Sequence, residues 1–261
     1  MKGRLVWMFA LLVALLPAGA QSYMFKHLEV KDGLSNNQVN AICKDSEGYM
    51  WFATASGLNC YDGYGIRVCR SEPNDTTTLP GNFISSIQED GDGFLWVQTD
   101  NGYARYNPAT ETFSRDVGTW LRKAGMEGGA SSIYIDSEKV FWVCLSGSGQ
   151  LWRYVPGGGR AVPVAFDPQG AGTLVSFAEH GDCLLMADEA GTLYALDRQT
   201  LQLKWKEDGF KELMRYEGRM PPLSLYAGRS GRVWIYCERG VGCYNLPQGR
   251  WEQLRRADEP F

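Results

Sequence analysis

Histidine is scarce in this sequence, and so are the patterns that depend on it. The 261 residues include only two histidines, His27 and His180. Neither occurs in an HxH or HExxH pattern, which argues against a zinc site and against a nucleophile activated by histidine. Seven cysteines are present, but no pair has CxxC spacing. We therefore expect no metal, no cofactor and no catalytic residue in this chain.

Clusters of basic residues are also missing. The chain has 26 Lys and Arg against 30 Asp and Glu, and its formal charge is −4. Proteins that bind nucleic acid usually carry a basic patch, so nucleic acid is not an expected partner. A phosphate-binding loop is absent too, because the glycines at 157–159 open no expected helix.

Long apolar runs are confined to the N-terminus. A basic head, twelve apolar residues at 5–16 and a small-residue segment at 18–20 follow one another. This order predicts a secretory signal peptide over residues 1–20, cleaved between Ala20 and Gln21. The alternative is an uncleaved anchor, although a bilayer span needs roughly 20 apolar residues. No later segment is apolar enough to span a membrane, so we expect an exported mature chain without a membrane span.

Helical periodicity is absent from residues 21–261, and one short pattern occurs there five times instead. Two clear copies are YMWFATASGLNCYDG at 49–63 and FLWVQTDNGYARYNP at 94–108. Successive copies lie 45, 46, 43 and 49 residues apart, and such a period is typical of a repeat architecture. The central positions are Trp51, Trp96, Trp142, Leu185 in a weaker copy, and Trp234.

Each copy divides into four short apolar or alternating segments separated by turn residues, which predicts four antiparallel strands. Repeated radially, such units form the blades of an all-β propeller. The periodic tryptophans are expected to fill the space between blades, and Gly57, Gly102 and Gly240 are expected at turns. The predicted blades cover residues 35–71, 80–117, 128–165, 172–207 and 220–256.

The cysteines lie mainly in strand-like segments, which favours small buried side chains over a disulfide framework. Cys60 and Cys243 both lie nine residues after a repeat tryptophan, which supports a packing role for each. An exported chain can still form one bridge, and Cys60–Cys69 is the nearest pair to consider.

Paired carboxylates, which glycosidases use, occur only in the repeated turns. Because the pairs recur at equivalent positions, they indicate turn chemistry rather than one active site. A calcium loop would need ligands that the sequence does not supply. The pairs are Asp45 and Glu47, Asp90 and Asp92, and Asp136 and Glu138.

Two of the copies resemble the two-component regulator propeller repeat, which runs roughly V-x-x-I-x-x-D-x-x-G-x-L-W-[IVF]-x-T-x-x-G-L-x-x-Y-[DN]. The third copy departs from it, because Lys139 replaces the turn glycine, and the fourth lacks the tryptophan and looks locally like a quinoprotein repeat. The matching residues are Val39, Ile42, Asp45, Gly48, Trp51, Thr54, Gly57, Leu58, Tyr61 and Asp62 in the first copy, and Ile84, Ile87, Asp90, Gly93, Leu95, Trp96, Thr99, Gly102, Tyr106 and Asn107 in the second.

This resemblance implies the periplasmic sensor of a Bacteroidetes hybrid two-component system. Such sensors detect an oligosaccharide released from a polysaccharide and signal to a cytoplasmic histidine kinase. The kinase and output domains are not in this sequence, so we expect no enzyme activity from it. Five blades and an opening strand at 25–30 would make twenty-one strands, which predicts the N-terminal part of a larger ring, of seven blades.

Ligand contacts are expected where the copies differ, because propeller sites lie on variable loops. Three aromatic residues in such stretches, Trp120, Phe210 and Tyr216, are candidates for contact with a sugar or with a second copy in a homodimer. The alternative is that they anchor their loops. Two other functions stay open, an exported scaffold for protein assembly and, less favoured, a propeller glycosidase or lyase.

Overall fold

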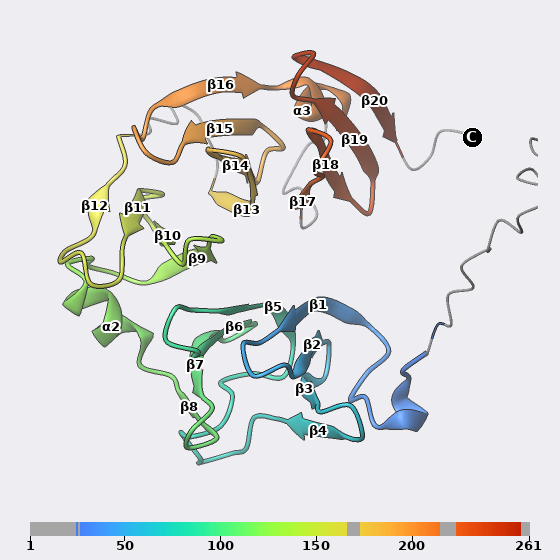
Figure 1. Cartoon of the computed structure of the whole chain (residues 1–261), viewed down its shortest axis with the longest axis vertical. Helices are drawn as coiled ribbons and strands as arrows, with labels where there is room; N and C mark the ends of the chain where they lie inside the picture. Colours follow the sequence, from blue (N-terminus) through green and yellow to red (C-terminus); the bar gives the residue numbers. More distant parts are fainter. Residues whose placement is uncertain (1–24, 26, 166–172, 215–222, 257–261) are drawn as a thin grey trace, which may run out of the picture.

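The computed structural model describes residues 25, 27–165, 173–214 and 223–256. These residues form five antiparallel sheets, each made of four consecutive strands, and we call the sheets blades 1 to 5. Figure 1 shows them side by side in an arc, which is open between blade 5 and blade 1. The predicted fold class, a β-propeller arrangement of five four-stranded blades, is confirmed.

The strands are β1 (Val39–Lys44), β2 (Met50–Thr54), β3 (Gly57–Tyr61) and β4 (Ile66–Cys69) in blade 1; β5 (Ile84–Glu89), β6 (Leu95–Thr99), β7 (Gly102–Asn107) and β8 (Thr112–Ser114) in blade 2; β9 (Ala130–Ile135), β10 (Phe141–Leu145), β11 (Leu151–Tyr154) and β12 (Val162–Pro163) in blade 3; β13 (Leu174–His180), β14 (Cys183–Asp188), β15 (Leu193–Asp197) and β16 (Leu203–Glu207) in blade 4; and β17 (Ser224–Ala227), β18 (Arg232–Cys237), β19 (Gly240–Asn245) and β20 (Arg250–Arg256) in blade 5.

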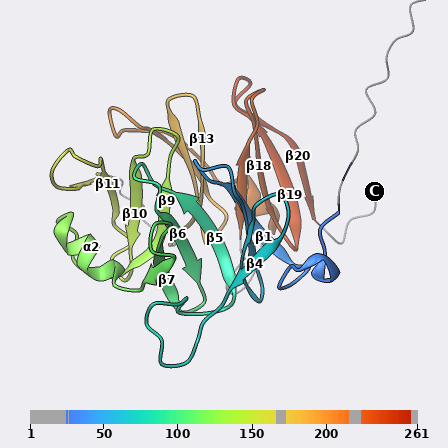
Figure 2. The ribbon, with the colours of Figure 1, turned by 60° about the horizontal axis from the view of Figure 1, so that its bottom comes forward.

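The first strand of every blade lies nearest the centre of the arc, and the fourth strand lies at its rim. Neighbouring first strands contact each other, as β1 does with β5 and β13 with β17. The view in Figure 2 shows the same sheets standing face to face rather than edge to edge. This stacking buries both faces of the second strands of blades 1 to 4, most completely in β10, where every residue is buried. The burial explains their nearly continuous apolar sequences.

The repeat tryptophans form the core between blades. Trp51 packs with residues of blade 2 such as Leu95, and Trp142 packs with residues of blade 4 such as Leu184. Trp51, Trp96 and Trp142 are at most 2% exposed, whereas Trp234 in blade 5 is half-buried. A buried aromatic side chain of this size removes roughly 150–250 Å² from water, which makes these residues major contributors to stability.

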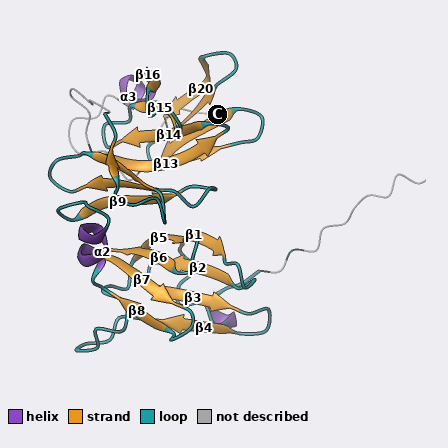
Figure 3. Ribbon diagram, turned by 60° about the vertical axis from the view of Figure 1, so that its left-hand side comes forward, coloured by secondary structure: helices purple, strands orange, loops and turns teal. Residues whose placement is uncertain are grey.

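Two short helices occur where the sequence predicts only loops. They are α2 (Val117–Lys123) and α3 (Gly209–Met214), and Figure 3 shows both outside the stacked sheets. Asp116 caps α2 by accepting a hydrogen bond from the Thr119 amide at 3.0 Å. Helices of seven and six residues are too short to leave a periodic apolar pattern, which is why the sequence does not reveal them.

The predicted opening strand at 25–30 is wrong for the described residues. Residues 25 and 27–29 have no regular structure, and a 3₁₀ helix, η1, covers Val30–Asp32. Blade 5 contains its own fourth strand, β20, as the count of five four-stranded blades predicts. The Val30 amide donates to Asn37 Oδ1 at 2.9 Å, so this part of the backbone is bonded to a side chain rather than to a neighbouring strand.

The Cys60–Cys69 bridge does not form, and all seven cysteines are free thiols. The strand register explains the result, because Cys60 lies opposite Arg67 while Cys69 lies opposite Leu58. Cys60 and Cys243 are both buried, in agreement with a packing role.

Side chains also tie neighbouring blades together at the turns after their first strands. Ser46 donates from its amide and its hydroxyl to Glu89 Oε1, at 2.8 and 2.6 Å. Ser137 makes the corresponding pair of contacts with Glu179, through its amide at 3.1 Å and its hydroxyl at 2.9 Å. Burial opposes ionisation of Glu89, but the hydrogen bonds from Ser46 and the nearby Lys139 ammonium together outweigh it and lower the pKa of this carboxyl.

Glu89→Gln is expected to reduce the free energy of unfolding by about 1 kcal/mol at pH 7, because the hydrogen bonds then reach an uncharged acceptor. The folded pKa of Glu89 lies below the unfolded value of about 4.3, so its contribution is present above that pH and disappears as the pH falls through the folded pKa. Urea unfolding at several pH values should show the variant and the parent converging in acid. An equal difference at all pH values would contradict this account, and exposed Glu47→Gln is the control.

The turn glycines differ in what they require of the backbone. Gly57 and Gly102 have φ values of 135° and 100°, whereas Gly240 is not among the glycines with positive φ. At Gly57 an added Cβ would also lie 2.9 Å from the carbonyl oxygen of Cys69. Gly57 is therefore fixed both by its dihedral angle and by the neighbouring strand.

Gly57→Ala is expected to lower the free energy of unfolding by about 2 kcal/mol, because the left-handed backbone and the close approach both disfavour a side chain. Gly65→Ala in the same blade is the matched control, since its Cβ meets no atom within 4 Å. Denaturant midpoints compare the two, and similar values for both variants would contradict the argument.

Candidate functional site

A buried carboxylate holds the repeat tryptophan in blades 1 to 3. Asp45 Oδ2 accepts a hydrogen bond from the Trp51 indole at 2.7 Å. The corresponding bonds are 2.9 Å from Trp96 to Asp90 and 3.0 Å from Trp142 to Asp136. In each case Oδ1 accepts the backbone amide four residues later, so one carboxylate closes the turn and fixes the indole. The sequence predicts that these aspartates stabilise turns, but it does not predict that they also bind the tryptophan indoles.

Blade 4 contains the same arrangement, displaced by one hairpin. Asp188 accepts the Thr192 amide at 2.8 Å and the Tyr194 hydroxyl at 2.9 Å. This turn joins β14 to β15, whereas Asp45 lies between β1 and β2. Because successive hairpins of an antiparallel sheet lie at opposite ends, the motif of blade 4 faces the other end of the propeller. Leu185, at the tryptophan position, is fully buried.

In the space between blades 2 and 3, an arginine lies against the bonded pair of Asp90 and Trp96. Arg105 lies opposite Trp96 in the strand register. Its guanidinium donates to Asp90 Oδ2 at 3.1 Å, and its Cζ lies 3.5 Å from the centroid of the Phe94 ring. Carboxylate and aromatic ring thus hold the cation from two sides.

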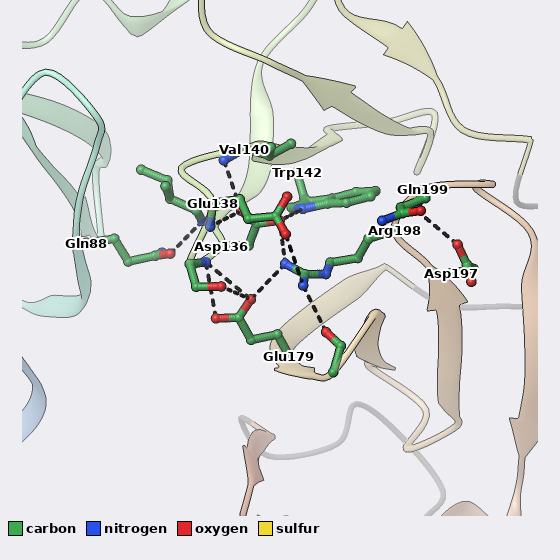
Figure 4. Close-up of polar contacts among 12 residues, drawn as sticks. Gln88, Asp136, Glu138, Val140, Trp142, Glu179, Asp197, Arg198 and Gln199 are labelled. Carbon is green, nitrogen blue, oxygen red and sulfur yellow. Dashed lines mark hydrogen bonds and ion pairs between the residues drawn. The ribbon is translucent and has the colours of Figure 1, made fainter. Parts of the chain in front are cut away.

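Between blades 3 and 4, two arginines occupy the equivalent place. Arg153 lies opposite Trp142 in the register, with its Cζ 5.9 Å from that ring. Arg198, from the turn before β16, pairs with Asp136 at 3.2 Å and with Glu179 at 3.0 Å. Figure 4 shows its guanidinium reaching across to both carboxylates.

Between blades 1 and 2, neither arginine is present. Cys60 lies opposite Trp51 in the register, where blades 2 and 3 have Arg105 and Arg153. Pro108 of blade 2 occupies the position that Arg198 has in blade 4. Each directly follows the residue that caps the turn before the fourth strand, which is Asn107 in blade 2 and Asp197 in blade 4. The cavity volumes decrease in the same order. They are about 460 Å³ between blades 1 and 2, about 210 Å³ between blade 2 and helix α2, and about 20 Å³ between blades 3 and 4.

The largest of these, the blade 1–2 cavity, combines aromatic rings with charged groups. Tyr49, which is 43% exposed, Trp51 and Tyr106 contribute rings. Arg67 donates to the Tyr106 hydroxyl at 3.0 Å and pairs with Glu111 at 3.5 Å. The remaining charged groups are the carboxylates Asp45, Glu47 and Asp62.

The ionisation of the cavity follows from its hydrogen bonds and its burial. Amides of Gly65 and Tyr64 donate to Asp62 and lower the pKa of its carboxyl. Burial raises the pKa of the Cys60 thiol and of the Tyr106 hydroxyl, so both stay protonated at neutral pH. The cavity therefore contains four carboxylates against one guanidinium, which favours a polar or cationic ligand group.

The three aromatic candidates from the sequence do not lie together. Trp120 borders the 210 Å³ cavity, but it packs against Trp96 with ring centroids 4.7 Å apart. Phe210 is fully buried beside Trp251 and presents no surface to a ligand. Tyr216 lies outside the described residues, as do Ala20 and Gln21. The cavity residues went unnoticed, although Cys60 in an arginine position is a visible departure between copies.

Comparison with known proteins identifies the repeats. Residues 33–56 and 78–101 match the family described as Two component regulator propeller. The chain contains repeats of this family. These two segments cover the asparagine-rich opening, the first two strands of blades 1 and 2, and the turns that contain Asp45 and Asp90.

The chain also resembles a curated histidine kinase and the extracellular domains of two-component systems. Histidine kinase P4 of Formosa agariphila is 40% identical over 74 residues, which are 28% of this chain and 5% of the kinase. The extracellular domains of hybrid two component systems BT3049 and BT4673 of B. thetaiotaomicron have a similar fold, with TM-scores of 0.55 and 0.53 at 17% and 18% identity. These matches cover 92% and 87% of this chain, but only 37% and 36% of those structures.

The described part of the chain includes no helix that is both long and apolar enough to cross a bilayer.

Asp136→Ala is expected to lower the free energy of unfolding by about 3 kcal/mol, because it leaves the Trp142 indole and part of the buried Arg198 guanidinium without an acceptor. Glu138→Ala removes a carboxylate that pairs with the same arginine but is 68% exposed, so it should cost less than about 0.5 kcal/mol. Chemical denaturation measures both, and an equal cost for the two variants would contradict the role of Asp136.

Proposed function

We propose that this chain is the ligand-sensing part of a two-component signalling receptor and that it binds an oligosaccharide in the blade 1–2 cavity. The matched propeller repeats and the partial likeness to a histidine kinase support the signalling role. The signal peptide predicted over residues 1–20 supports a periplasmic location. Signal transmission would then depend on kinase and output regions not contained in this sequence.

The observation that carries this proposal is that Tyr49, a solvent-exposed tyrosine, lines the cavity beside several charged side chains. Ligand pockets typically have volumes of roughly 300–1,000 Å³, and the blade 1–2 cavity, at about 460 Å³, lies in this range. The exposed face of Tyr49 offers an apolar platform for the ring of a sugar. Carboxylates and the Arg67 guanidinium supply acceptors and donors for its hydroxyl groups.

Titration calorimetry with a panel of tetrasaccharides tests the proposal on the purified chain. Tyr49→Ala should weaken binding about tenfold, which corresponds to the loss of one aromatic contact of about 1.4 kcal/mol. Tyr64→Ala is the matched control, because Tyr64 lies in the same blade but is 97% exposed and outside the cavity lining. Failure of every tetrasaccharide to bind, or equal losses in the two variants, would refute the proposal.

A further inference from the structure

The blade 1–2 cavity lies at a position that is equivalent in the next two pairs of blades. In those pairs arginine side chains of the protein occupy the position, whereas in the blade 1–2 cavity it is accessible to a ligand. The frame is the same in all three, consisting of a turn aspartate, the tryptophan bonded to it, and the residue four positions after the aspartate. At this last position Tyr49 in blade 1 corresponds to Phe94 in blade 2. The chemical group bound at this place in blade 2 therefore indicates which ligand group can bind at the same place in blade 1.

In blade 2 that group is a guanidinium placed between the Asp90 carboxylate and the Phe94 ring. In blade 3 a guanidinium from Arg198 reaches the Asp136 carboxylate. Both frames thus bind a cation at the oxygen that also accepts the indole. Asp45 Oδ2 accepts the Trp51 indole in the same way, but no ion pair joins Asp45 to a basic side chain among the described residues.

Arg67 borders the cavity without occupying this place. It projects from the outer strand β4, and its guanidinium is engaged with the Tyr106 hydroxyl and with Glu111. Its Cζ lies 6.0 Å from the Trp51 centroid, close to the 5.8 Å between Arg105 and Trp96, but Arg67 forms its ion pair with Glu111 rather than with Asp45. Asp45 and Tyr49 thus remain available to a cation from outside, and Glu47 and Asp62 add negative charge.

We propose that the cavity binds the protonated amino group of an amino sugar, with the ammonium at Asp45 and the sugar ring on Tyr49. This inference rests on the proposed function and names the class of oligosaccharide. A carboxylate and an aromatic face are the partners that bind ammonium and guanidinium groups alike. The four carboxylates of the cavity disfavour an acidic sugar.

The test compares a tetramer of glucosamine with the N-acetylglucosamine tetramer, which has the same rings but no charge. At about pH 6 such an amine is protonated. Calorimetry on the full chain should show at least tenfold tighter binding of the glucosamine tetramer, and this preference should shrink as salt is added. Asp45→Asn should remove most of the preference.

Cys60→Arg tests the origin of the cavity, because it restores the residue that blade 2 has at this register. The new arginine should fill the cavity and reduce binding of the glucosamine tetramer at least tenfold. Pro108→Arg, at the exposed position equivalent to Arg198, is a second way to fill it if Cys60→Arg fails to fold. Leu203→Arg on β16, 45% exposed, is the charge-matched control and should leave binding unchanged.

The outcomes separate this inference from the proposed function. Equal binding of the two tetramers, lost in Tyr49→Ala, would overturn the amine preference and leave the oligosaccharide sensor intact. Binding of methylguanidinium that Cys60→Arg abolishes, with no binding of either tetramer, would show a cation site for another class of molecule and refute the saccharide ligand. Tight binding of the glucosamine tetramer that survives both arginine variants would place the site elsewhere and overturn the inference.

Discussion

The hydrogen bond between a turn aspartate and the tryptophan six residues later is the interaction on which this propeller depends. One oxygen of the carboxylate closes the turn through a backbone amide, and the other holds the indole. The turn therefore sets the orientation of the side chain that fills the space between blades. Since each such tryptophan packs on the following blade, a local bond of about 3 Å determines how two sheets stack.

In blades 2 and 3 the carboxylate that makes this bond also pairs with a positive charge. A carboxylate that is almost completely buried, as Asp90 and Asp136 are, needs partners for its remaining acceptor capacity. An indole and an amide are neutral donors, so the net charge is compensated only when a guanidinium is added. The aspartates of blades 2 and 3 receive one from different elements, Arg105 of β7 and Arg198 of blade 4, which indicates that the charge at this place matters more than the strand that supplies it.

Much of the fold could be predicted from the sequence, because four tryptophans and a period near 45 residues report the stacking of blades directly. The short helices and the absence of an opening strand could not, since segments of three to seven residues leave no periodic pattern. The candidate site was missed because its members come from two blades. Asp45 and Pro108 become neighbours through register and stacking, which no spacing along the chain reveals. A comparison of the copies shows the arginine positions, but only the structure shows that Arg153 and Arg198 share one space.

Blade 5 shows why a cysteine opposite the tryptophan is not by itself a sign of a cavity. Cys243 lies opposite Trp234, as Cys60 lies opposite Trp51. Gly228, however, takes the place of the turn aspartate, and the Cys243 thiol lies beside Glu252, a carboxylate already paired with Arg232 at 2.7 Å. No buried aspartate therefore calls for a cation there, and the cysteine packs as a small apolar side chain. A cavity suited to a cation needs three conditions together: the aspartate, a following blade that encloses it, and a small residue in place of the arginine. Among the described blades, only the first with its neighbour combines them.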